Sequence, residues 1–122
     1  MIKTIKIILV LMFSLFSSDF NKKKSKNAPM SIYDISIKNI EGSEMSLSDY
    51  KGKYMLFVNV ASNCGFTRQY KDLQQLYDQN SDKLVVIGVP CNQFGAQEPG
   101  SEDQISIFCS EKYNVSFPMT EK

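Results

Sequence analysis

The chain has 122 residues, 43% of them hydrophobic and 22% charged, a composition typical of a globular protein with room for one domain. It contains no histidine, which excludes Ser-His-Asp and Cys-His nucleophilic systems and disfavours a protein zinc or copper site. The net charge is +1 and Arg68 is the only arginine, so no nucleic-acid partner is expected. We therefore expect no metal and no cofactor, and chemistry carried by cysteine, carboxylate, amide or backbone groups.

Residues 1–18 have the pattern of a secretory signal peptide. Two lysines precede an almost purely apolar run at residues 7–16 (IILVLMFSLF), and two serines follow it. This run is shorter than the roughly 20 apolar residues that a membrane-spanning helix needs. We expect an extracytoplasmic protein, periplasmic or secreted, and keep an uncleaved membrane anchor or a cytoplasmic start as alternatives.

Residues 19–30 are expected to form a polar linker ahead of a domain at residues 31–122. The lysine-rich stretch at residues 22–26 (KKKSK) is interpreted as a solvated spacer. Its alternative role is attraction to anionic lipid head groups, which requires the preceding apolar segment to stay in the membrane.

The first part of the domain is expected to form a small hairpin. Residues 32–37 (IYDISI) alternate apolar and polar side chains and predict a half-buried strand, and residues 39–43 predict a turn. Residues 45–47 predict a second short strand. Residues 48–52 predict a loop or a single helical turn.

A strand-helix-strand unit is predicted next. Residues 54–60 (YMLFVNV) are nearly all apolar and predict a strand buried on both faces. Residues 67–80 carry apolar side chains at helical spacing, and residues 84–89 (LVVIGV) predict a second buried strand that Pro90 ends. This order predicts a right-handed crossover and a parallel strand pair.

A last helix is predicted to begin after Ser101. Ser101 and Gln104 form a capping box, in which each side chain accepts a hydrogen bond from the other residue's backbone N–H. The helix is expected to run to about Tyr113. Its apolar side carries Ile105, Phe108 and Cys109.

The three cysteines, Cys64, Cys91 and Cys109, lack the spacing of Cys-x-x-Cys pairs or metal fingers. Cys64 is expected in the turn between the first buried strand and the following helix, where unpaired backbone N–H groups favour a thiolate, the nucleophilic form. Spacing alone leaves two interpretations open, a nucleophile or a packing cysteine.

The other two cysteines also have simple interpretations. Cys109 is either a core residue or a second thiol that meets oxidised Cys64 if its helix unwinds locally. Cys91 follows Pro90 at a strand end, and packing is the favoured interpretation for it.

Two blocks of sequence together resemble the glutathione peroxidase family. They are residues 59–67 (NVASNCGFT), followed by Gln69 and Tyr70, and residues 89–100 (VPCNQFGAQEPG). The segments on either side also resemble the family, so that the likeness covers about residues 31–119. The resemblance implies an α/β, thioredoxin-like fold.

The resemblance implies roles for three residues. Cys64 matches the peroxidatic cysteine, whose thiolate attacks a hydroperoxide and becomes a sulfenic acid. Gln97 matches the glutamine whose amide hydrogen-bonds near the reactive sulfur. Cys109 matches the resolving cysteine of cysteine-type members that prefer thioredoxin, and it would form a disulfide with Cys64. Cys91 is common in the family and is not usually required.

The implied partners are a hydroperoxide and a thiol reductant. The substrate is expected to be hydrogen peroxide or an organic hydroperoxide. A thioredoxin-like reductant is favoured over glutathione because Cys109 is present and Arg68 alone is available to bind the carboxylates of glutathione.

The chain departs from the family pattern in its last part. The family's site is completed by a later Trp-Asn pair, and this chain contains no tryptophan. We therefore expect a thioredoxin-like fold that is incomplete at the C-terminus, without the second strand-strand-helix unit, leaving an unpaired strand edge and an uncovered apolar face. Two alternatives to a working peroxidase are a peroxide-sensing redox switch and an inactive truncated fragment.

Overall fold

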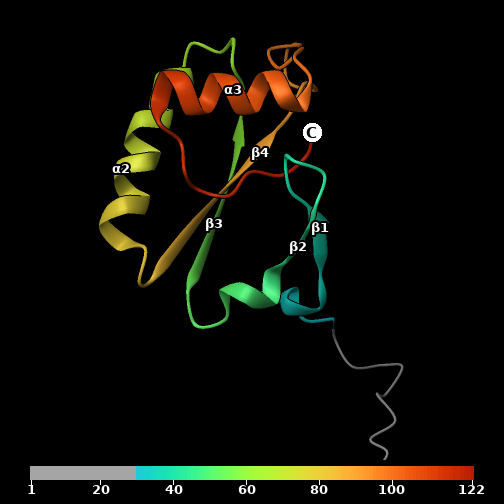
Figure 1. Cartoon of the computed structure of the whole chain (residues 1–122), viewed down its shortest axis with the longest axis vertical. Helices are drawn as coiled ribbons and strands as arrows, with labels where there is room; N and C mark the ends of the chain where they lie inside the picture. Colours follow the sequence, from blue (N-terminus) through green and yellow to red (C-terminus); the bar gives the residue numbers. More distant parts are fainter. Residues whose placement is uncertain (1–29) are drawn as a thin grey trace, which may run out of the picture.

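The computed structural model describes residues 30–122, which form a mixed α/β arrangement (Figure 1). The proposed signal peptide and most of the proposed linker lie outside the described residues. Within the described part, no helix is long and apolar enough to span a membrane. The elements, in chain order, are η1 (Ile32–Asp34), β1 (Ser36–Lys38), β2 (Glu44–Ser46), η2 (Leu47–Tyr50), β3 (Tyr54–Val60), η3 (Thr67–Gln69), α2 (Tyr70–Asn80), β4 (Leu84–Pro90) and α3 (Glu102–Tyr113).

The predicted hairpin is present, but its first strand is shorter than expected. β1 and β2 pair antiparallel from Ser36 with Ser46 to Lys38 with Glu44. Residues 32–34 form a 3-10 turn instead of a strand, so this part of the prediction is wrong. Ser31 caps this turn, because its Oγ accepts a hydrogen bond from the N–H of Tyr33 at 3.3 Å. Such a side-chain hydrogen bond competes with the strand-to-strand hydrogen bonds that a longer β1 would require.

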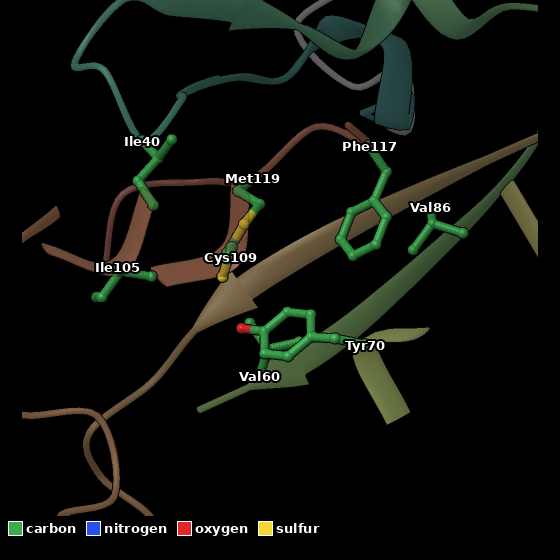
Figure 2. Close-up of a cluster of buried hydrophobic side chains, with 8 residues drawn as sticks. All are labelled: Ile40, Val60, Tyr70, Val86, Ile105, Cys109, Phe117 and Met119. Carbon is green, nitrogen blue, oxygen red and sulfur yellow. The ribbon is translucent and has the colours of Figure 1, made fainter. Parts of the chain in front are cut away.

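The strand-helix-strand unit is confirmed. β3 and β4 pair parallel from Tyr54 with Leu84 to Val60 with Pro90, and α2 connects them. β4 is buried on both faces, since Val86 belongs to one hydrophobic cluster and Val85 to another. The first cluster lies against α2 and α3 (Figure 2), and the second lies against the hairpin.

β3 is not buried on both faces, contrary to the prediction. Leu56 is 37% exposed and Phe57 is 42% exposed. Successive residues of a strand point to opposite faces, so neither face of β3 is completely covered, although Val58 packs against one cluster and Met55 against the other. Within the described residues, β3 pairs with β4 alone. The expected unpaired strand edge is therefore present among the described residues, whereas the exposed apolar side chains of β3 are divided between its two faces and do not form one uncovered face.

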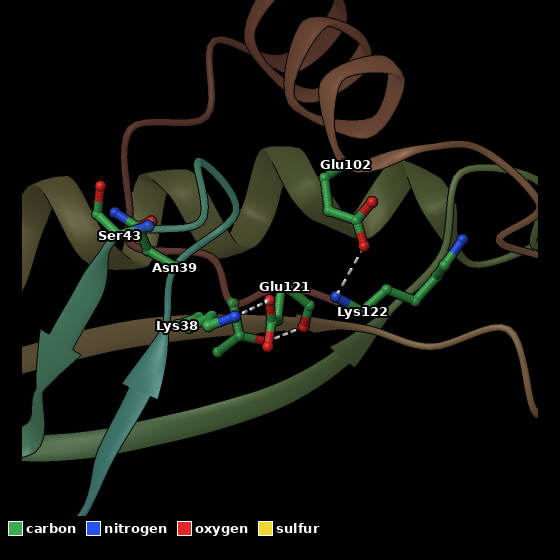
Figure 3. Close-up of polar contacts among 7 residues, drawn as sticks. Lys38, Asn39, Ser43, Glu102, Glu121 and Lys122 are labelled. Atoms are coloured by element: carbon green, nitrogen blue, oxygen red, sulfur yellow. Dashed lines mark hydrogen bonds and ion pairs between the residues drawn. The ribbon is translucent and has the colours of Figure 1, made fainter.

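The segment after α3 joins the hairpin to β4. The backbone N–H of Thr120 donates to Gly88 O at 2.9 Å, and the N–H of Ile40 donates to Met119 O at 2.9 Å. Figure 3 shows the polar contacts that accompany this bridge, including an ion pair of 3.8 Å between Lys38 and Glu121. The hairpin and the parallel strands thus pack as one body around β4.

α3 begins and ends as its sequence predicts. The N–H of Gln104 donates to Ser101 Oγ at 3.3 Å, and the N–H of Ser101 donates to Gln104 Oε1 at 3.0 Å, which completes the capping box. Asn114 ends the helix in the left-handed conformation, with φ of 52°. α3 crosses near the carboxyl ends of β3 and β4 and buries Ile105 and Cys109 (Figure 1).

Candidate active site

Cys64 lies in the loop between β3 and η3, where the sequence predicted it. The backbone N–H of Phe66 donates to Cys64 Sγ at 3.4 Å, so the sulfur already accepts a hydrogen bond. A donor held in this position stabilises negative charge on the sulfur. η3 separates Cys64 from α2, so the N–H group beside the sulfur belongs to the loop and not to the start of α2.

Thr67 fixes the shape of the loop that carries Cys64. Its Oγ1 accepts from the N–H of Cys64 at 2.9 Å and donates to Ala61 O at 2.7 Å. The N–H of Thr67 in turn donates to Cys64 O at 3.1 Å. One hydroxyl therefore connects the residue just after β3 to the cysteine. Thr67 was not among the predicted site residues, although a threonine three residues after Cys64 is a common side-chain-to-backbone pattern.

We expect Thr67→Val to lower the free energy of unfolding by about 1–3 kcal/mol, because it leaves the Cys64 N–H and the Ala61 carbonyl without their partner. Urea unfolding followed by circular dichroism measures this change. Thr67→Ser is the matched control, since it keeps the hydroxyl, and it should lose less than half as much. Equal stability of Thr67→Val and the parent chain would contradict the role of the hydroxyl.

Cys64 and Gln97, which the resemblance to the family pairs, lie at the same cavity. They line one cavity of about 140 Å³. The N–H of Asn63 donates to Gln97 O at 3.0 Å, which ties the loop carrying Cys64 to the loop carrying Gln97. The other lining residues are aromatic, small or polar: Asn59, Val60, Ala61, Phe66, Thr67, Gln69, Tyr70, Cys91 and Phe94.

The loop that carries Gln97 is held in an unusual backbone conformation. Gly95 has a φ of 70° and Ala96 a φ of 54°, a region that costs a residue with a side chain about 1–2 kcal/mol. Asn92 Oδ1 accepts from the N–H of Glu98 at 2.9 Å and closes the loop. The two left-handed residues turn the chain immediately before Gln97, which reaches the cavity.

Cys91 lines the same cavity as Cys64. This proximity was not predicted, because Cys91 was interpreted as a packing residue. It follows β4 directly, and its N–H donates to Val60 O at 3.2 Å. The carboxyl ends of parallel strands meet at one edge of a sheet, so the positions of Cys64 and Cys91 just after β3 and β4 were a signal for this proximity.

The structure does not place Cys109 at the cavity that Cys64 lines. It lies on α3, 2% exposed, in the cluster with Val60, Tyr70 and Phe117 (Figure 2). Burial raises the pKa of the Cys109 thiol, the Glu98 carboxylate adds to this shift, and the Tyr70 hydroxyl offsets part of it. All three cysteines are free thiols in the structure.

The described residues contain no group of three or more His, Cys, Asp or Glu side chains placed to hold a metal ion. The reactive groups at the cavity are thus the thiols of Cys64 and Cys91, the carboxamide of Gln97 and backbone N–H groups. A thiol in this position can attack an electrophile. The amide donors beside it can stabilise the negative charge that develops during the attack.

Comparison with known proteins identifies the family of the chain. Residues 32–122 match the glutathione peroxidase family. The glutathione peroxidase-like peroxiredoxin 2 of Saccharomyces cerevisiae is 52% identical over 93 residues, which are 75% of this chain and 57% of that protein. The hydroperoxy fatty acid reductase gpx1 of Synechocystis is 50% identical over 92 residues, 75% of this chain and 54% of that protein. The chain spans about half the length of these curated relatives.

The fold also resembles that of a thiol-disulfide oxidoreductase. The thioredoxin domain of a thiol-disulfide oxidoreductase from Bacteroides vulgatus aligns with a TM-score of 0.51 and 22% identity, over 74% of this chain and 61% of that one. The parallel strand-helix-strand unit therefore belongs to a thioredoxin-like fold. Within that class, the chain belongs to the glutathione peroxidase family.

Proposed function

We propose that this chain carries the peroxide-reacting part of a thiol peroxidase. The Cys64 thiolate attacks one oxygen of a hydroperoxide, the O–O bond breaks, and the departing oxygen takes a proton to give water or an alcohol. Cys64 is left as a sulfenic acid. The observation that carries the proposal is the shared cavity, in which Cys64 accepts the Phe66 N–H and lies beside Gln97.

Gln97 is proposed to stabilise the charge of this step. Its side-chain amide is a donor that lies at the cavity, so it can hydrogen-bond the thiolate and then the departing oxygen. Donors that are fixed before the reaction need no reorganisation when charge moves from sulfur to oxygen.

The proposed substrates are hydrogen peroxide and organic hydroperoxides. Two aromatic side chains line the cavity and are largely exposed, Phe66 at 67% and Phe94 at 63%. They offer an apolar surface to an organic substrate, and one relative is named a hydroperoxy fatty acid reductase.

Cys109 is proposed to resolve the sulfenic acid. Its thiol attacks the Cys64 sulfur, a disulfide forms, and the hydroxyl leaves as water. A dithiol reductant of thioredoxin type then regenerates both thiols. The relative named a peroxiredoxin and the single arginine, Arg68, favour this reductant over glutathione. An extracytoplasmic thioredoxin-like partner follows if residues 1–18 act as the proposed signal peptide, and sequencing the N-terminus of the expressed protein tests their removal.

The test uses Cys109→Ser. We expect the parent chain to lose two thiols to one equivalent of hydrogen peroxide and to form a Cys64–Cys109 disulfide, identified by peptide mapping. Cys109→Ser should keep a sulfenic acid that dimedone traps, and it should show no sustained NADPH consumption with thioredoxin and thioredoxin reductase. Cys91→Ser is the matched cysteine control and should form the same disulfide. A Cys64–Cys91 disulfide in the parent chain would overturn the assignment of Cys109.

A second candidate function is a peroxide-sensing switch. Cys109 lies in the main hydrophobic cluster, so a disulfide with Cys64 requires α3 to rearrange. A single fast oxidation without thioredoxin-dependent turnover would favour the switch. An inactive fragment is the remaining alternative, and the absence of a cooperative thermal transition would favour it.

A further inference from the structure

Backbone hydrogen bonds join the end of α3, which carries Cys109, to the segment that follows the helix. The carbonyl of Cys109 accepts from the N–H of Val115 at 3.1 Å, and the carbonyl of Ser110 accepts from the N–H of Asn114 at 3.0 Å. A movement that carries Cys109 out of the core must therefore break these bonds or displace residues 114–116 together with the end of the helix.

One side chain of α2 holds the segment after α3 in place. Gln74 Oε1 accepts from the N–H of Ser116 at 2.8 Å, and Gln74 Nε2 donates to Ser116 Oγ at 2.8 Å. The same Nε2 group donates to Asp78 Oδ1 at 2.7 Å, one turn further along α2. Figure 1 shows the segment, in red, descending beside α2. The Gln74 carboxamide thus connects α2 to the chain just beyond Cys109.

The Gln74–Ser116 pair has a defined closed geometry and can open locally. Gln74 is 8% exposed, and a buried carboxamide costs folding free energy unless its groups are hydrogen-bonded. Here its carbonyl oxygen and both of its N–H groups have partners. Ser116 is exposed, so water can replace Gln74 as its partner when the segment moves away. Exposed hydrogen bonds of this kind open at lower free energy than the core does.

The chain on either side of this region is held more firmly. Phe117 belongs to the main hydrophobic cluster (Figure 2), and the N–H of Gly88 donates to Pro118 O at 2.9 Å. At the other end, the capping box holds the first turn of α3. Local opening is therefore expected at the end of α3 and at residues 114–116, and the Gln74–Ser116 pair lies within this stretch.

We propose that Gln74 is a positioning residue for the resolving step, an inference that rests on the proposed function. Its two hydrogen bonds to Ser116 keep the end of α3 closed, with Cys109 in the core. Their release lets this end unwind, so that Cys109 reaches oxidised Cys64. Gln74 takes no part in the covalent step and sets how readily Cys109 becomes available.

The covalent step is that of the proposed function. The Cys109 sulfur bonds to the Cys64 sulfur while the S–O bond of the sulfenic acid breaks. The departing hydroxyl leaves as water with the proton of the Cys109 thiol. Cys109 is oxidised and the sulfenic sulfur of Cys64 is reduced.

The test is Gln74→Ala, which removes the carboxamide. The chain is mixed with one equivalent of hydrogen peroxide, quenched with acid at set times, and assayed separately for sulfenic acid and for the Cys64–Cys109 disulfide. We expect disulfide formation to speed up by about tenfold, because two hydrogen bonds that oppose opening are lost. Sulfenic acid formation at Cys64 should keep the parent rate. An unchanged or slower rate of disulfide formation overturns the proposal.

A second pair of variants changes the exposed partner and leaves Gln74 in place. Ser116→Ala removes the hydroxyl acceptor and keeps the N–H, so disulfide formation should speed up by about threefold, as expected for loss of one hydrogen bond. Ser116→Thr keeps the hydroxyl and should form the disulfide at the parent rate. Equal rates for Ser116→Ala and Ser116→Thr would overturn the proposal, even if Gln74→Ala fails to fold.

Amide hydrogen exchange separates local opening from a general loss of stability. It is measured on the reduced chain without peroxide. In Gln74→Ala, the N–H groups of residues 114–116 should exchange about tenfold faster, while those of β4 keep the parent rate. A uniform increase over β4 and the end of α3 would assign the effect to general destabilisation and would overturn the proposal.

Gln75→Ala is the matched control, because Gln75 is an exposed amide next to Gln74 on α2. Its disulfide should form at the parent rate, and equal acceleration in both variants overturns the proposal. The proposed function fails separately. If the parent chain forms no Cys64–Cys109 disulfide, the resolving role of Cys109 falls, and this inference falls with it. If the parent chain forms the disulfide and Gln74→Ala does so no faster, only this inference falls.

Discussion

Cys64→Ser is expected to abolish peroxide consumption, lowering the rate of the first step by roughly a thousandfold or more. A serine hydroxyl in the same position keeps the Phe66 N–H donor but is not ionised at neutral pH, so it cannot attack the O–O bond. Stopped-flow measurement of hydrogen peroxide loss, at protein concentrations above that of the peroxide, follows this single step.

Cys109→Ser is the matched comparison for Cys64→Ser. It makes the same sulfur-to-oxygen change in the buried thiol, and it should still consume one equivalent of peroxide because Cys64 and the cavity are intact. Peroxide consumption by Cys64→Ser at a rate close to that of the parent chain would mean that another group is the nucleophile. Cys91, which lines the same cavity, would then be the first candidate.

The regular elements could be predicted where local chemistry decides them. The capping box at Ser101 and Gln104 uses residues three apart, and it forms as expected. The apolar run at residues 84–89 forms a buried strand, since both of its faces are covered. The same kind of run at residues 54–60 forms a strand that has exposed side chains on both of its faces. The pattern indicates a strand, whereas burial depends on which segments are present to pack against it.

The hairpin illustrates a competition that periodicity does not resolve. The alternation at residues 32–37 favours a strand along its whole length. The Ser31 side chain, however, accepts the backbone N–H of Tyr33, and a 3-10 turn replaces the first half of the strand. A local hydrogen bond one residue outside the pattern therefore determined where β1 begins.

The reactive residues of the site could be predicted from the sequence, whereas the packing contacts around them could not. The resemblance placed Cys64 and Gln97 together, and the structure brings them into one cavity. The burial of Glu98, which is 1% exposed, had no sequence signal, because glutamate is rarely fully buried. Tyr70, which lies 39 residues before Cys109 in the chain, meets it only because α2 and α3 pack in the same hydrophobic cluster.

Gln97→Ala is expected to slow the first oxidation of Cys64 by about 10²–10³-fold, the range for loss of one fixed donor to a developing negative charge. The reason is that charge leaves the sulfur and appears on the departing oxygen, and the amide of Gln97 lies at the cavity where this happens. The rate is measured by stopped flow in a Cys109→Ser background, so that disulfide formation does not contribute.

The matched control for Gln97→Ala is Gln79→Ala, which removes an exposed amide from α2 and should leave the rate unchanged. Unfolding in urea separates a chemical effect from a structural one, because the Gln97 contact with the neighbouring loop uses the backbone carbonyl and survives the substitution. A large loss of rate at unchanged stability therefore assigns the effect to the amide. A rate within threefold of the parent would mean that the Phe66 N–H, and not Gln97, is the donor on which the reaction depends.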